Sequence, residues 1–443
     1  MLHLYNYLTR TKELFKPLKN RQVGLYTCGP TVYDRIHIGN LRTYIFEDVL
    51  KKTLELNNYK VKHIMNITDV EDKIIKKMQA ENKTLQEVTQ PYIDLFFTDI
   101  KKLNISPANK YPQAIKYIKQ IIKMVSKLLK KGFAYQSEDG SIYFDISKFE
   151  KYGKLSGLDK KNLKHGARVD SDEYDKKNAG DFVLWKTTKK DELSWEAPFG
   201  KGRPGWHIEC SAMSIKELGK TFDIHAGAVD LIFPHHENEI AQSEAVTGKE
   251  FAKYWIEGEH LLVENKKMSK SLGNFYTLED IEKKGFDPLA FRYLTLNTHY
   301  RTKLNFTWES LENAKNGLKK LREQVQELGN KKGKPYREYT ELFKEKMNDD
   351  LNTPQALAIV QKLLKKNIPN EDKLATTLEF DKVLGLDLNK KVEIPEDIKR
   401  LAKEREQARQ EKNYEKSDQL REVLEKKGWN VKDTEQGPTL TQN

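Results

Sequence analysis

The sequence predicts an α/β protein built around a parallel β-sheet. The segment RQVGLYTCGP has the pattern of a short strand that ends in a turn at Gly29 and Pro30, and residues 41–56 repeat apolar side chains at helical spacing. The segment YKVKHIMNITD then supplies a second strand. This β–α–β order indicates a parallel sheet of a nucleotide-binding type, in which ligands bind beyond the carboxyl ends of the strands.

The middle of the chain predicts an insertion into this sheet. Helical patterns run from about residue 69 to 132, and QSEDGSIYFDIS then indicates a β-hairpin that opens a polar stretch rich in Lys and Asp. After about residue 205, GWHIECSAMSIKEL predicts a helix, FDIHAGAVDLIF a buried strand and HHENEIAQSEAV another helix. The parallel sheet therefore resumes after the insertion.

The C-terminal part is predicted to be mostly helical. MNDDLNTPQALAIVQKLLKK has the pattern of a helix capped around Asn352, and two amphipathic helices with charged outer faces follow Pro395. A length of 443 residues fits three or four domains at roughly 150 residues each. We predict the first half of the sheet domain over 1–120, an inserted domain over 121–205, the second half of the sheet domain over 206–262, a loop-containing region over 263–315, a helical bundle over 316–388 and a small domain over 389–443.

The charge of the chain favours a polyanionic partner. Lys and Arg number 78 against 66 Asp and Glu, which gives a net charge of +12. A lysine-rich composition with no such partner would give the same balance. The first twenty residues lack the apolar stretch and small-residue site of a secretory leader, and no run approaches the roughly 18 apolar residues of a membrane span. We therefore expect a cytoplasmic protein that makes no membrane contact.

Two short motifs point to binding of a polyphosphate. HIGN, residues 37–40, lies between strand and helix, where an imidazole, a close-approaching glycine and an amide could surround a phosphate. KKMSKSLGN, residues 266–274, presents Lys267 and Lys270 in a loop that could meet negative charge on a phosphoryl group. Taken alone, the first motif is more often an ordinary turn and the second a solvated loop. No GxxxxGK[ST] motif occurs, which disfavours a P-loop ATPase.

PHHENE, residues 234–239, and the two cysteines of the chain suggest a metal site. Cys28 and Cys210 both fall in the sheet domain, although two unrelated buried thiols are the commoner situation. If residues 235–240 are helical, His235 and Glu239 form an i,i+4 pair on one face, while His236 and Glu237 lie behind it or on the surface. Two thiolates, an imidazole and a carboxylate favour zinc over calcium or magnesium.

Several motifs, taken in order, resemble the cysteinyl-tRNA synthetase family of class I aminoacyl-tRNA synthetases. They are CGPTVYD, GWHIECSAM, FPHHENEIAQSE and KMSKSLGN, and the resemblance runs from about residue 20 to 308 and more weakly through MNDDLNTPQAL. One position departs from the family, because Asn40 stands where the HIGH signature ends in His. An amide can still donate a hydrogen bond, so we expect activity with altered ATP contacts.

The resemblance implies ATP-dependent ligation of L-cysteine to tRNA(Cys) through cysteinyl-adenylate. It implies a Rossmann-type catalytic core with an insertion, a stem-contact region around KMSKS, a helical bundle, a small C-terminal anticodon-binding domain and a monomeric state. Zinc, bound to Cys28, Cys210, His235 and Glu239, would recognise the substrate thiolate, and Mg²⁺ would bind with ATP. The residues implied for catalysis are His37, Asn40, Lys267 and Lys270; Gly39 and Ser269 join these four in binding ATP, and Gly29, Thr68, Trp206 and Asp230 line the cysteine pocket.

Two alternatives stay open at this point. A cysteine ligase that joins the same adenylate to an amino-sugar acceptor resembles the catalytic core but lacks the tRNA-facing C-terminal region. A non-catalytic zinc protein that binds RNA would also fit the charge, but it has no need of His37 or the two KMSKS lysines. Cysteine-dependent exchange between ATP and pyrophosphate would exclude the second alternative.

Overall fold

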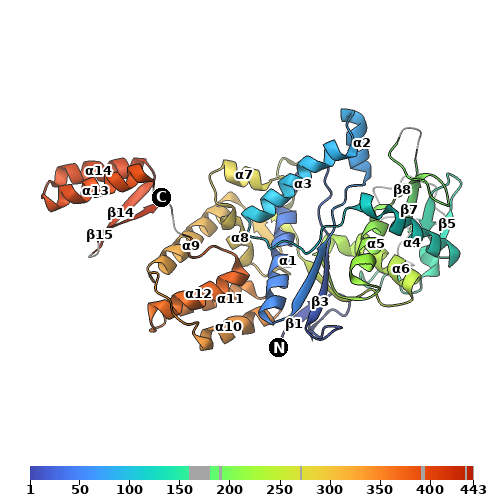
Figure 1. Cartoon of the computed structure of the whole chain (residues 1–443), viewed down its shortest axis with the longest axis horizontal. Helices are drawn as coiled ribbons and strands as arrows, with labels where there is room; N and C mark the ends of the chain where they lie inside the picture. Colours follow the sequence, from blue (N-terminus) through green and yellow to red (C-terminus); the bar gives the residue numbers. More distant parts are fainter. Residues whose placement is uncertain (159–179, 189–191, 270–271, 391–394, 435–436, 443) are drawn as a thin grey trace. The chain divides into compact units, whose positions relative to one another are not determined.

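The chain is described by a computed structural model, which covers residues 1–443 apart from 159–179, 189–191, 270–271, 391–394, 435–436 and 443. The described residues form two compact units, Met1–Leu388 and Asn389–Asn443 (Figure 1). The finer domain boundaries given above stay predictions.

A four-stranded parallel sheet forms the centre of the first unit. Its order is β10 (Ala252–Gly258), β9 (Phe222–Ala228), β3 (Gln22–Thr27) and β4 (Lys60–Met65), and every neighbouring pair is parallel. Helix α1 (Ile38–Leu56) connects β3 to β4. The predicted β–α–β unit and α/β class are therefore confirmed, although α1 begins three residues before the predicted Leu41.

Helices that precede and follow the insertion in the sequence pack around this sheet. They are α2 (Asp72–Glu81), α3 (Leu85–Lys102), α4 (Ile118–Lys130), α5 (Trp206–Leu218) and α6 (Glu237–Thr247). Between β9 and α6 the chain forms two short turns, Val229–Leu231 and Ile232–His236, with a cis peptide bond at Phe233–Pro234. The predicted helix, strand and helix of the segment after residue 205 are confirmed.

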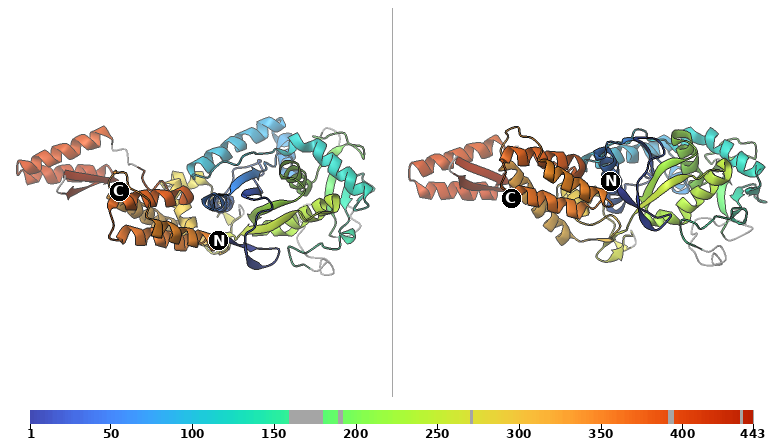
Figure 2. Two further views of the ribbon diagram at one scale, coloured as in Figure 1. Left: turned by 60° about the horizontal axis from the view of Figure 1, so that its bottom comes forward. Right: turned by 90° about the horizontal axis from the view of Figure 1, so that it is seen from below.

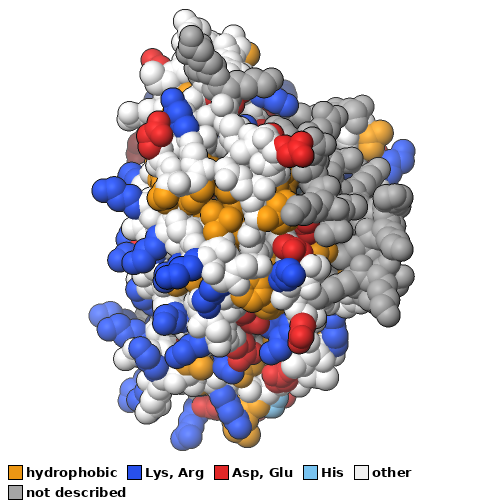
Figure 3. Space-filling model, turned by 90° about the vertical axis from the view of Figure 1, so that its right-hand side faces the viewer, with side chains coloured by type: hydrophobic (Ala, Val, Ile, Leu, Met, Phe, Trp, Pro, Cys, Tyr) orange, Lys and Arg blue, Asp and Glu red, His pale blue; other side chains and the backbone are white. Residues whose placement is uncertain are grey.

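The insertion contains an antiparallel sheet. Its strands are β5 (Ala134–Gln136), β6 (Ile142–Phe144), β7 (Phe182–Thr187) and β8 (Gly202–Pro204), in that order. Lys186 and Arg203 both form ion pairs with Asp72 at the start of α2, which fixes this sheet to the core. In Figure 2, α1 lies between the bundle helices and the inserted sheet, and Figure 3 looks onto the end of the unit that carries β5 and α4.

The remainder of the first unit is mostly helical. Its helices are α7 (Leu278–Lys283), α8 (Pro288–Leu296), α9 (Trp308–Gln326), α10 (Arg337–Asn348), α11 (Thr353–Lys365) and α12 (Asn370–Leu384). Its strands are β1 (His3–Asn6), β2 (Thr11–Leu14), β11 (Leu261–Val263), β12 (Lys266–Lys267) and β13 (Leu304–Phe306). The Asn352 side chain accepts a hydrogen bond from the Gln355 N–H, so the predicted cap of α11 is confirmed. Among the described helices, none is both long and apolar enough to cross a membrane.

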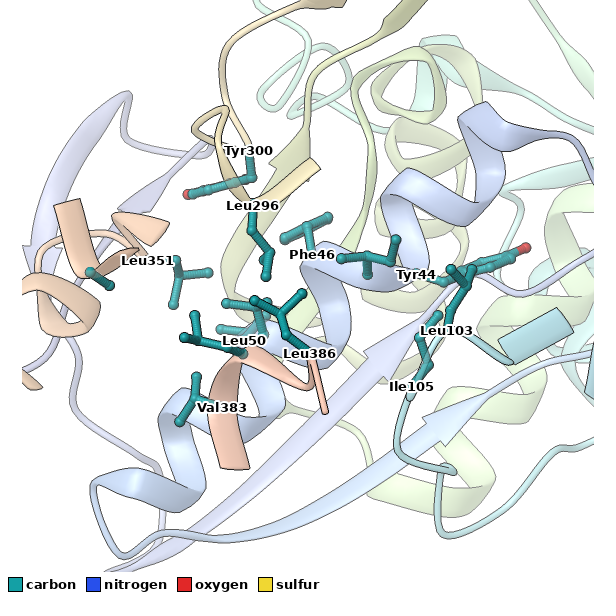
Figure 4. Packing of buried hydrophobic residues seen from close by; sticks show 14 of the residues in the cluster. Tyr44, Phe46, Leu50, Leu103, Ile105, Leu296, Tyr300, Leu351, Val383 and Leu386 are labelled. Carbon is teal, nitrogen blue, oxygen red and sulfur yellow. The ribbon is translucent and has the colours of Figure 1, made fainter. Parts of the chain in front are cut away.

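The core of this unit joins α1 to the helical bundle. Figure 4 shows Phe46 and Leu50 of α1 packed with Leu296, Leu351 and residues around α12. Within this core the Asp48 carboxylate and the Arg292 guanidinium form an ion pair of 2.6 Å with both side chains fully buried. We call this pair the Asp48–Arg292 joint.

The second unit is a small α/β domain. Helices α13 (Glu396–Gln410) and α14 (Tyr414–Lys426) precede an antiparallel pair of strands, β14 (Trp429–Thr434) and β15 (Gly437–Gln442). Trp429 is buried with Ile398, Ala402 and Leu424 in a core of its own. The two helices match the prediction, whereas the strands were not predicted.

Candidate active site and metal centre

The start of α1 is fixed by a reciprocal cap. The Asn40 N–H donates to His37 Nδ1 at 3.2 Å, and the His37 N–H donates to Asn40 Oδ1, also at 3.2 Å. The amide that replaces the usual histidine of the signature is therefore used in holding the helix terminus. Burial lowers the pKa of His37, although Asp230 opposes this shift, so the imidazole is neutral near pH 7.

Gly39 lets the backbone approach the His37 ring. A Cβ at this position would lie 2.8 Å from His37 Cε1 and 3.2 Å from Met268 Cε. A side chain at position 39 would therefore push against both the cap and the KMSKS loop. The bare backbone leaves the first-turn N–H groups of α1 close to the space in front of the helix.

That space is a cleft of about 540 Å³ at the carboxyl end of the sheet. Eight of the predicted site residues line it: Cys28, Gly29, His37, Gly39, Asn40, Trp206, Asp230 and Lys267. The predicted site residues that do not line it are Ser269, Thr68, Cys210, His235 and Glu239. Lys270 lies outside the described residues.

Gly29 and Thr68 shape one wall of the cleft. The Gly29 N–H donates to Asn66 Oδ1 at 3.0 Å, and a Cβ at this position would lie only 1.8 Å from the Asn66 carbonyl oxygen. The Thr68 N–H donates to the Pro30 carbonyl, and the Thr68 carbonyl accepts from the Val32 N–H. Thr68 thus holds the segment after Gly29 through its backbone rather than by facing the cleft.

The KMSKS loop is tied both to itself and to α1. The Ser269 N–H donates to Asn274 Oδ1 at 2.8 Å, and the Asn274 amide donates to the Lys267 carbonyl at 3.2 Å. Beyond the loop, the Ile38 N–H donates to the Tyr276 carbonyl at 2.9 Å. Two sequence motifs more than two hundred residues apart therefore face the same cleft.

Arg42 links the two walls of this cleft, a contact that the sequence did not predict. It is buried in α1, and one guanidinium nitrogen donates to the carbonyls of Glu259 at 2.7 Å and His260 at 2.5 Å. The other donates to the Thr302 carbonyl. Burial lowers the pKa of Arg42 to about 10, with Glu259 opposing, so the group still carries its charge at pH 7. The turn that lines the cleft with Glu259 and His260 is thereby held against α1.

Four predicted metal ligands come together beside the cleft, and Cys28 is the one of the four that lines it. One ligand atom from each of Cys28, Cys210, His235 and Glu239 lies within 4.8 Å of the other three, and all four residues are buried. Cys28 follows β3, Cys210 lies in α5, and Glu239 lies in α6, with His235 in the turn before it. His235 Nε2 is 3.1 Å from Glu239 Oε1, which is the predicted i,i+4 contact. We call these four residues the metal group.

The donor set of the metal group suits a soft divalent cation. A hydrogen bond from Cys28 lowers the pKa of Cys210 to about 6, while burial opposes this shift, so a thiolate is available near neutral pH. Burial alone would raise the pKa of Glu239, but His225 and His235 hold it well below its usual range. Two sulfur atoms, an imidazole and an ionised carboxylate are the ligands of zinc rather than of calcium or magnesium.

A second set of histidines surrounds the metal group. His236 Nε2 lies 3.6 Å from Cys28 Sγ, and His236 Nδ1 lies 2.9 Å from a carboxylate oxygen of Glu257. His225 Nε2 lies 3.1 Å from Glu239 Oε2. Cys28, His225, His236 and Glu239 also have ligand atoms within 4.8 Å of one another, so this second set shares two residues with the first. These histidines orient the ligands that they touch.

The surface alternative for His236 and Glu237 is wrong, since both are fully buried. The Glu237 carboxylate accepts N–H groups from Gly153, Leu155 and Ser156, which ties the inserted segment to the turn that carries His235. His225 was also missed as a neighbour of the site. The only available signal was a polar ring in the middle of the apolar strand FDIHAGA.

Comparison with known proteins agrees with this arrangement. The family model described as the class I (C) tRNA synthetase catalytic domain matches residues 14–316, the DALR domain matches 342–389, and the cysteinyl-tRNA ligase anticodon binding domain matches 391–438. Cysteine--tRNA ligase of Chlamydia felis is 48% identical, and the alignment covers 99% of this chain and 97% of that protein. Cysteine--tRNA ligase of Protochlamydia amoebophila is 46% identical with the same coverage of both chains.

A solved structure with much lower identity shares the fold. Mycobacterium tuberculosis methionyl-tRNA synthetase, solved in complex with methionyl-adenylate, has a TM-score of 0.57 at 14% identity, covering 82% of this chain and 89% of that one. That likeness concerns the fold alone. The catalytic-domain match over most of the chain and the relatives that are nearly half identical along its length show that it belongs to the cysteinyl-tRNA synthetase family of class I tRNA synthetases.

Proposed function

We propose that this chain joins L-cysteine to tRNA(Cys) at the described cleft, in two steps that use ATP. A cysteine carboxylate oxygen attacks the α-phosphorus of ATP, the bond to the bridging oxygen breaks, and pyrophosphate leaves. A terminal ribose hydroxyl of the tRNA then attacks the carbonyl carbon of cysteinyl-adenylate, and AMP leaves. The observation that carries this proposal is that Cys28 of the metal group lines the same cleft as the HIGN terminus of α1.

The walls of the cleft supply the ATP contacts in this proposal. His37 offers a neutral imidazole and Gly39 a backbone N–H at a helix terminus, which suit phosphate oxygens, and Asn40 holds that terminus through the cap. Lys267 faces them from the KMSKS loop, and Ser269 and Lys270 complete the set by family resemblance. No protein nucleophile takes part, so catalysis rests on positioning and on charge stabilisation, with Mg²⁺ accompanying ATP.

The metal group, which reaches the cleft through Cys28, selects the amino acid in this proposal. We assign Cys28, Cys210, His235 and Glu239 as zinc ligands; when bound there, zinc would supply a Lewis acid that prefers a thiolate to an alcohol. Ordinary pocket contacts separate near-isosteres such as cysteine and serine by only about 1–3 kcal/mol, so selection needs a stronger difference.

Other residues that line the cleft hold the remaining groups of the amino acid. Trp206 and Asp230 line the cleft next to Cys28, where an indole face and a carboxylate suit the body and the ammonium group of an amino acid. Gly29 gives the backbone approach that a side chain would block, and Thr68 positions that segment.

The tRNA substrate is supported by the second unit. Residues 391–438 match an anticodon-binding model, which the amino-sugar alternative does not need, so the comparisons do not favour that alternative. The net charge of +12 suits a polyanion. Cytoplasmic location and a monomeric state stay predictions from the sequence and the family.

The test is aminoacylation of total tRNA with labelled cysteine or serine, before and after treatment with a chelator. We expect charging with cysteine only, its loss with the metal, and its return when zinc is restored. Charging of serine at a comparable rate, or undiminished charging by metal-free protein, would contradict the proposed selection. Cysteine-dependent ATP–pyrophosphate exchange without any tRNA charging would revive the amino-sugar alternative.

A further inference from the structure

Helix α4 has two faces of very different character. Ile118, Ile121, Met124, Val125 and Leu128 are buried against the core that also contains residues of α5 and α6. The opposite face carries exposed lysines and continues one turn earlier into the short turn before the helix. The members of this lysine row are Lys116, Lys119, Lys123, Lys127 and Lys130.

The positive charges of the lysine row are not paired with acidic side chains among the described residues. The sequence of α4, IKQIIKMVSKLLK, contains no Asp or Glu, and no ion pair of the row is present among the described residues. Other helices balance their lysines within three or four residues, as in Lys51–Glu55 of α1 and Lys382–Glu379 of α12. In α4 the i,i+4 neighbours are instead like charges, Lys119 with Lys123 and Lys123 with Lys127, which disfavours the helix.

The helix dipole accounts for only part of the row. Lys127 and Lys130 lie in the last turn of α4, where positive charge is favourable. Lys119 lies in the first turn, where the dipole opposes a cation, and Lys123 lies in the middle. The row therefore accumulates positive charge beyond what the stability of the helix requires.

The charge and polarity of the surface around the lysine row indicate which class of partner could bind there. Figure 3 shows Lys and Arg side chains gathered along one side of this end of the molecule, with few acidic side chains among them. None of the described exposed large apolar side chains belongs to α4, so the row lacks anchors for a bilayer interior. Lysine is depleted at protein–protein interfaces and is a main phosphate contact in nucleic-acid complexes.

We propose that the lysine row binds the phosphate backbone of RNA at a site separate from the catalytic cleft. Four residues along α4 rise about 6 Å, so successive ammonium groups form a line with a spacing comparable to that of neighbouring phosphates on one strand. No member of the row lines the cleft, so this contact adds affinity for RNA without taking part in amino-acid activation. The proposal goes beyond the proposed function, because it needs no catalytic step.

The experiment compares the full-length protein with a triple variant, Lys119→Gln, Lys123→Gln and Lys127→Gln. Binding to a fluorescent tRNA(Cys) transcript and to an unrelated RNA of equal length is measured across a range of salt concentrations. We expect the variant to bind about 10-fold more weakly, and the slope of log affinity against log salt to fall by about 2–3. A loss for both RNAs supports a general phosphate contact, and a loss for tRNA(Cys) alone supports a contact with the substrate itself.

Two controls separate local charge from total charge and from folding. The variant Lys60→Gln, Lys220→Gln and Lys249→Gln removes the same charge from exposed positions outside α4 and should keep nearly all of the affinity. The variant Lys119→Arg, Lys123→Arg and Lys127→Arg keeps the positive charges and should bind as the unmodified protein does.

Three results would overturn the proposal. The first is an α4 glutamine variant whose affinity for RNA and salt slope are unchanged. The second is a control glutamine variant that loses as much RNA affinity as the α4 variant does. The third is an α4 glutamine variant that loses binding to anionic phospholipid vesicles but keeps its binding to RNA. Cysteine-dependent ATP–pyrophosphate exchange, measured without RNA, should be equal in all four proteins. Its absence from the unmodified protein would contradict the proposed function and leave the RNA measurement valid.

Discussion

The Asp48–Arg292 joint and the metal group are both clusters of buried polar side chains, but only the joint has partners for all of its charges. Arg292 donates to Asp48, to the Leu384 carbonyl at 2.6 Å and to the Leu103 carbonyl at 2.8 Å. Asp48 also accepts from the Ser106 N–H at 2.8 Å and pairs with Lys52. Each charge of the joint therefore meets an opposite charge or a hydrogen-bond partner inside the protein.

The metal group gathers donors of the same kind. Two thiols and a carboxylate converge on a space of a few ångströms, and His235 is the single basic partner within the group. Its neighbours His225 and His236 add further potential ligand atoms beside it. The comparison teaches that a buried cluster with balanced charges holds the fold, whereas a buried cluster of electron-pair donors is built for a cation.

The largest effect should come from removing one partner of the Asp48–Arg292 joint. Arg292→Met leaves Asp48 with only Lys52 as a cationic partner, and we expect a loss of about 3–5 kcal/mol of unfolding free energy in urea. Lys382→Met, which removes an exposed pair of the same bundle, should cost less than about 1 kcal/mol. Equal losses of unfolding free energy in the two variants would show that the buried joint contributes no more to stability than the exposed pair.

The metal group should respond in activity and metal content. We expect Cys210→Ser to lower bound metal and cysteine-dependent ATP–pyrophosphate exchange together, by about 100-fold or more, because a sulfur ligand is lost. Ser214→Ala, one turn further along α5, should retain both. Metal analysis of the purified proteins, together with the exchange assay, checks this expectation. A metal-free variant with full exchange activity would contradict the assignment of the metal ligands.

Arg42 tests whether the walls of the cleft need a fixed separation. Arg42→Lys keeps a charge but cannot reach the carbonyls of Glu259, His260 and Thr302 with one ammonium group. We expect the KM for ATP to rise about 10-fold while the KM for cysteine changes by less than about 2-fold. Equal rises in both constants would point to a general loss of structure instead.

The smallest effect concerns acid stability. Burial alone would raise the pKa of Asp48, but Arg292 and Lys52 lower it below the ordinary value of 3.8. The ion pair therefore contributes stability above about pH 4 and loses it as the pH falls through the lowered pKa. The difference in urea midpoint between the unmodified protein and Asp48→Asn should shrink between pH 5 and the lowest pH at which both remain folded. A constant difference would contradict the linkage.

The sequence predicted those parts of the fold and site that depend on local pattern. Apolar periodicity located β3, α1, β4 and the later α5–β9–α6 segment, and the i,i+4 spacing of His235 and Glu239 predicted their contact. The start of α1 at Ile38 was missed because it depends on the side-chain cap between His37 and Asn40. Strands β14 (WNVKDT) and β15 (GPTLTQ) were missed because each contains too few apolar residues to mark a strand in the sequence.

Contacts between distant segments could not be predicted in the same way. Three contacts join groups from different elements, whose approach depends on how the sheet and helices pack. They are Glu257 with His236, Arg42 with the His260 carbonyl, and His225 with Glu239. Nothing in the spacing of those residues along the chain signals it. The grouping of the cysteines was predictable only because both were assigned to one sheet.

The metal group also bears on how the protein is made. Its ligands are spread from position 28 to position 239, and the whole inserted segment is synthesised between the first and the second of them. A ribosome-bound chain that stops before Glu239 offers at most three of the four, unlike a zinc finger whose ligands emerge within a few dozen residues. If zinc binds the metal group as we propose, loading of the ion follows synthesis of residue 239, so free zinc acts on a chain that already contains all four ligands.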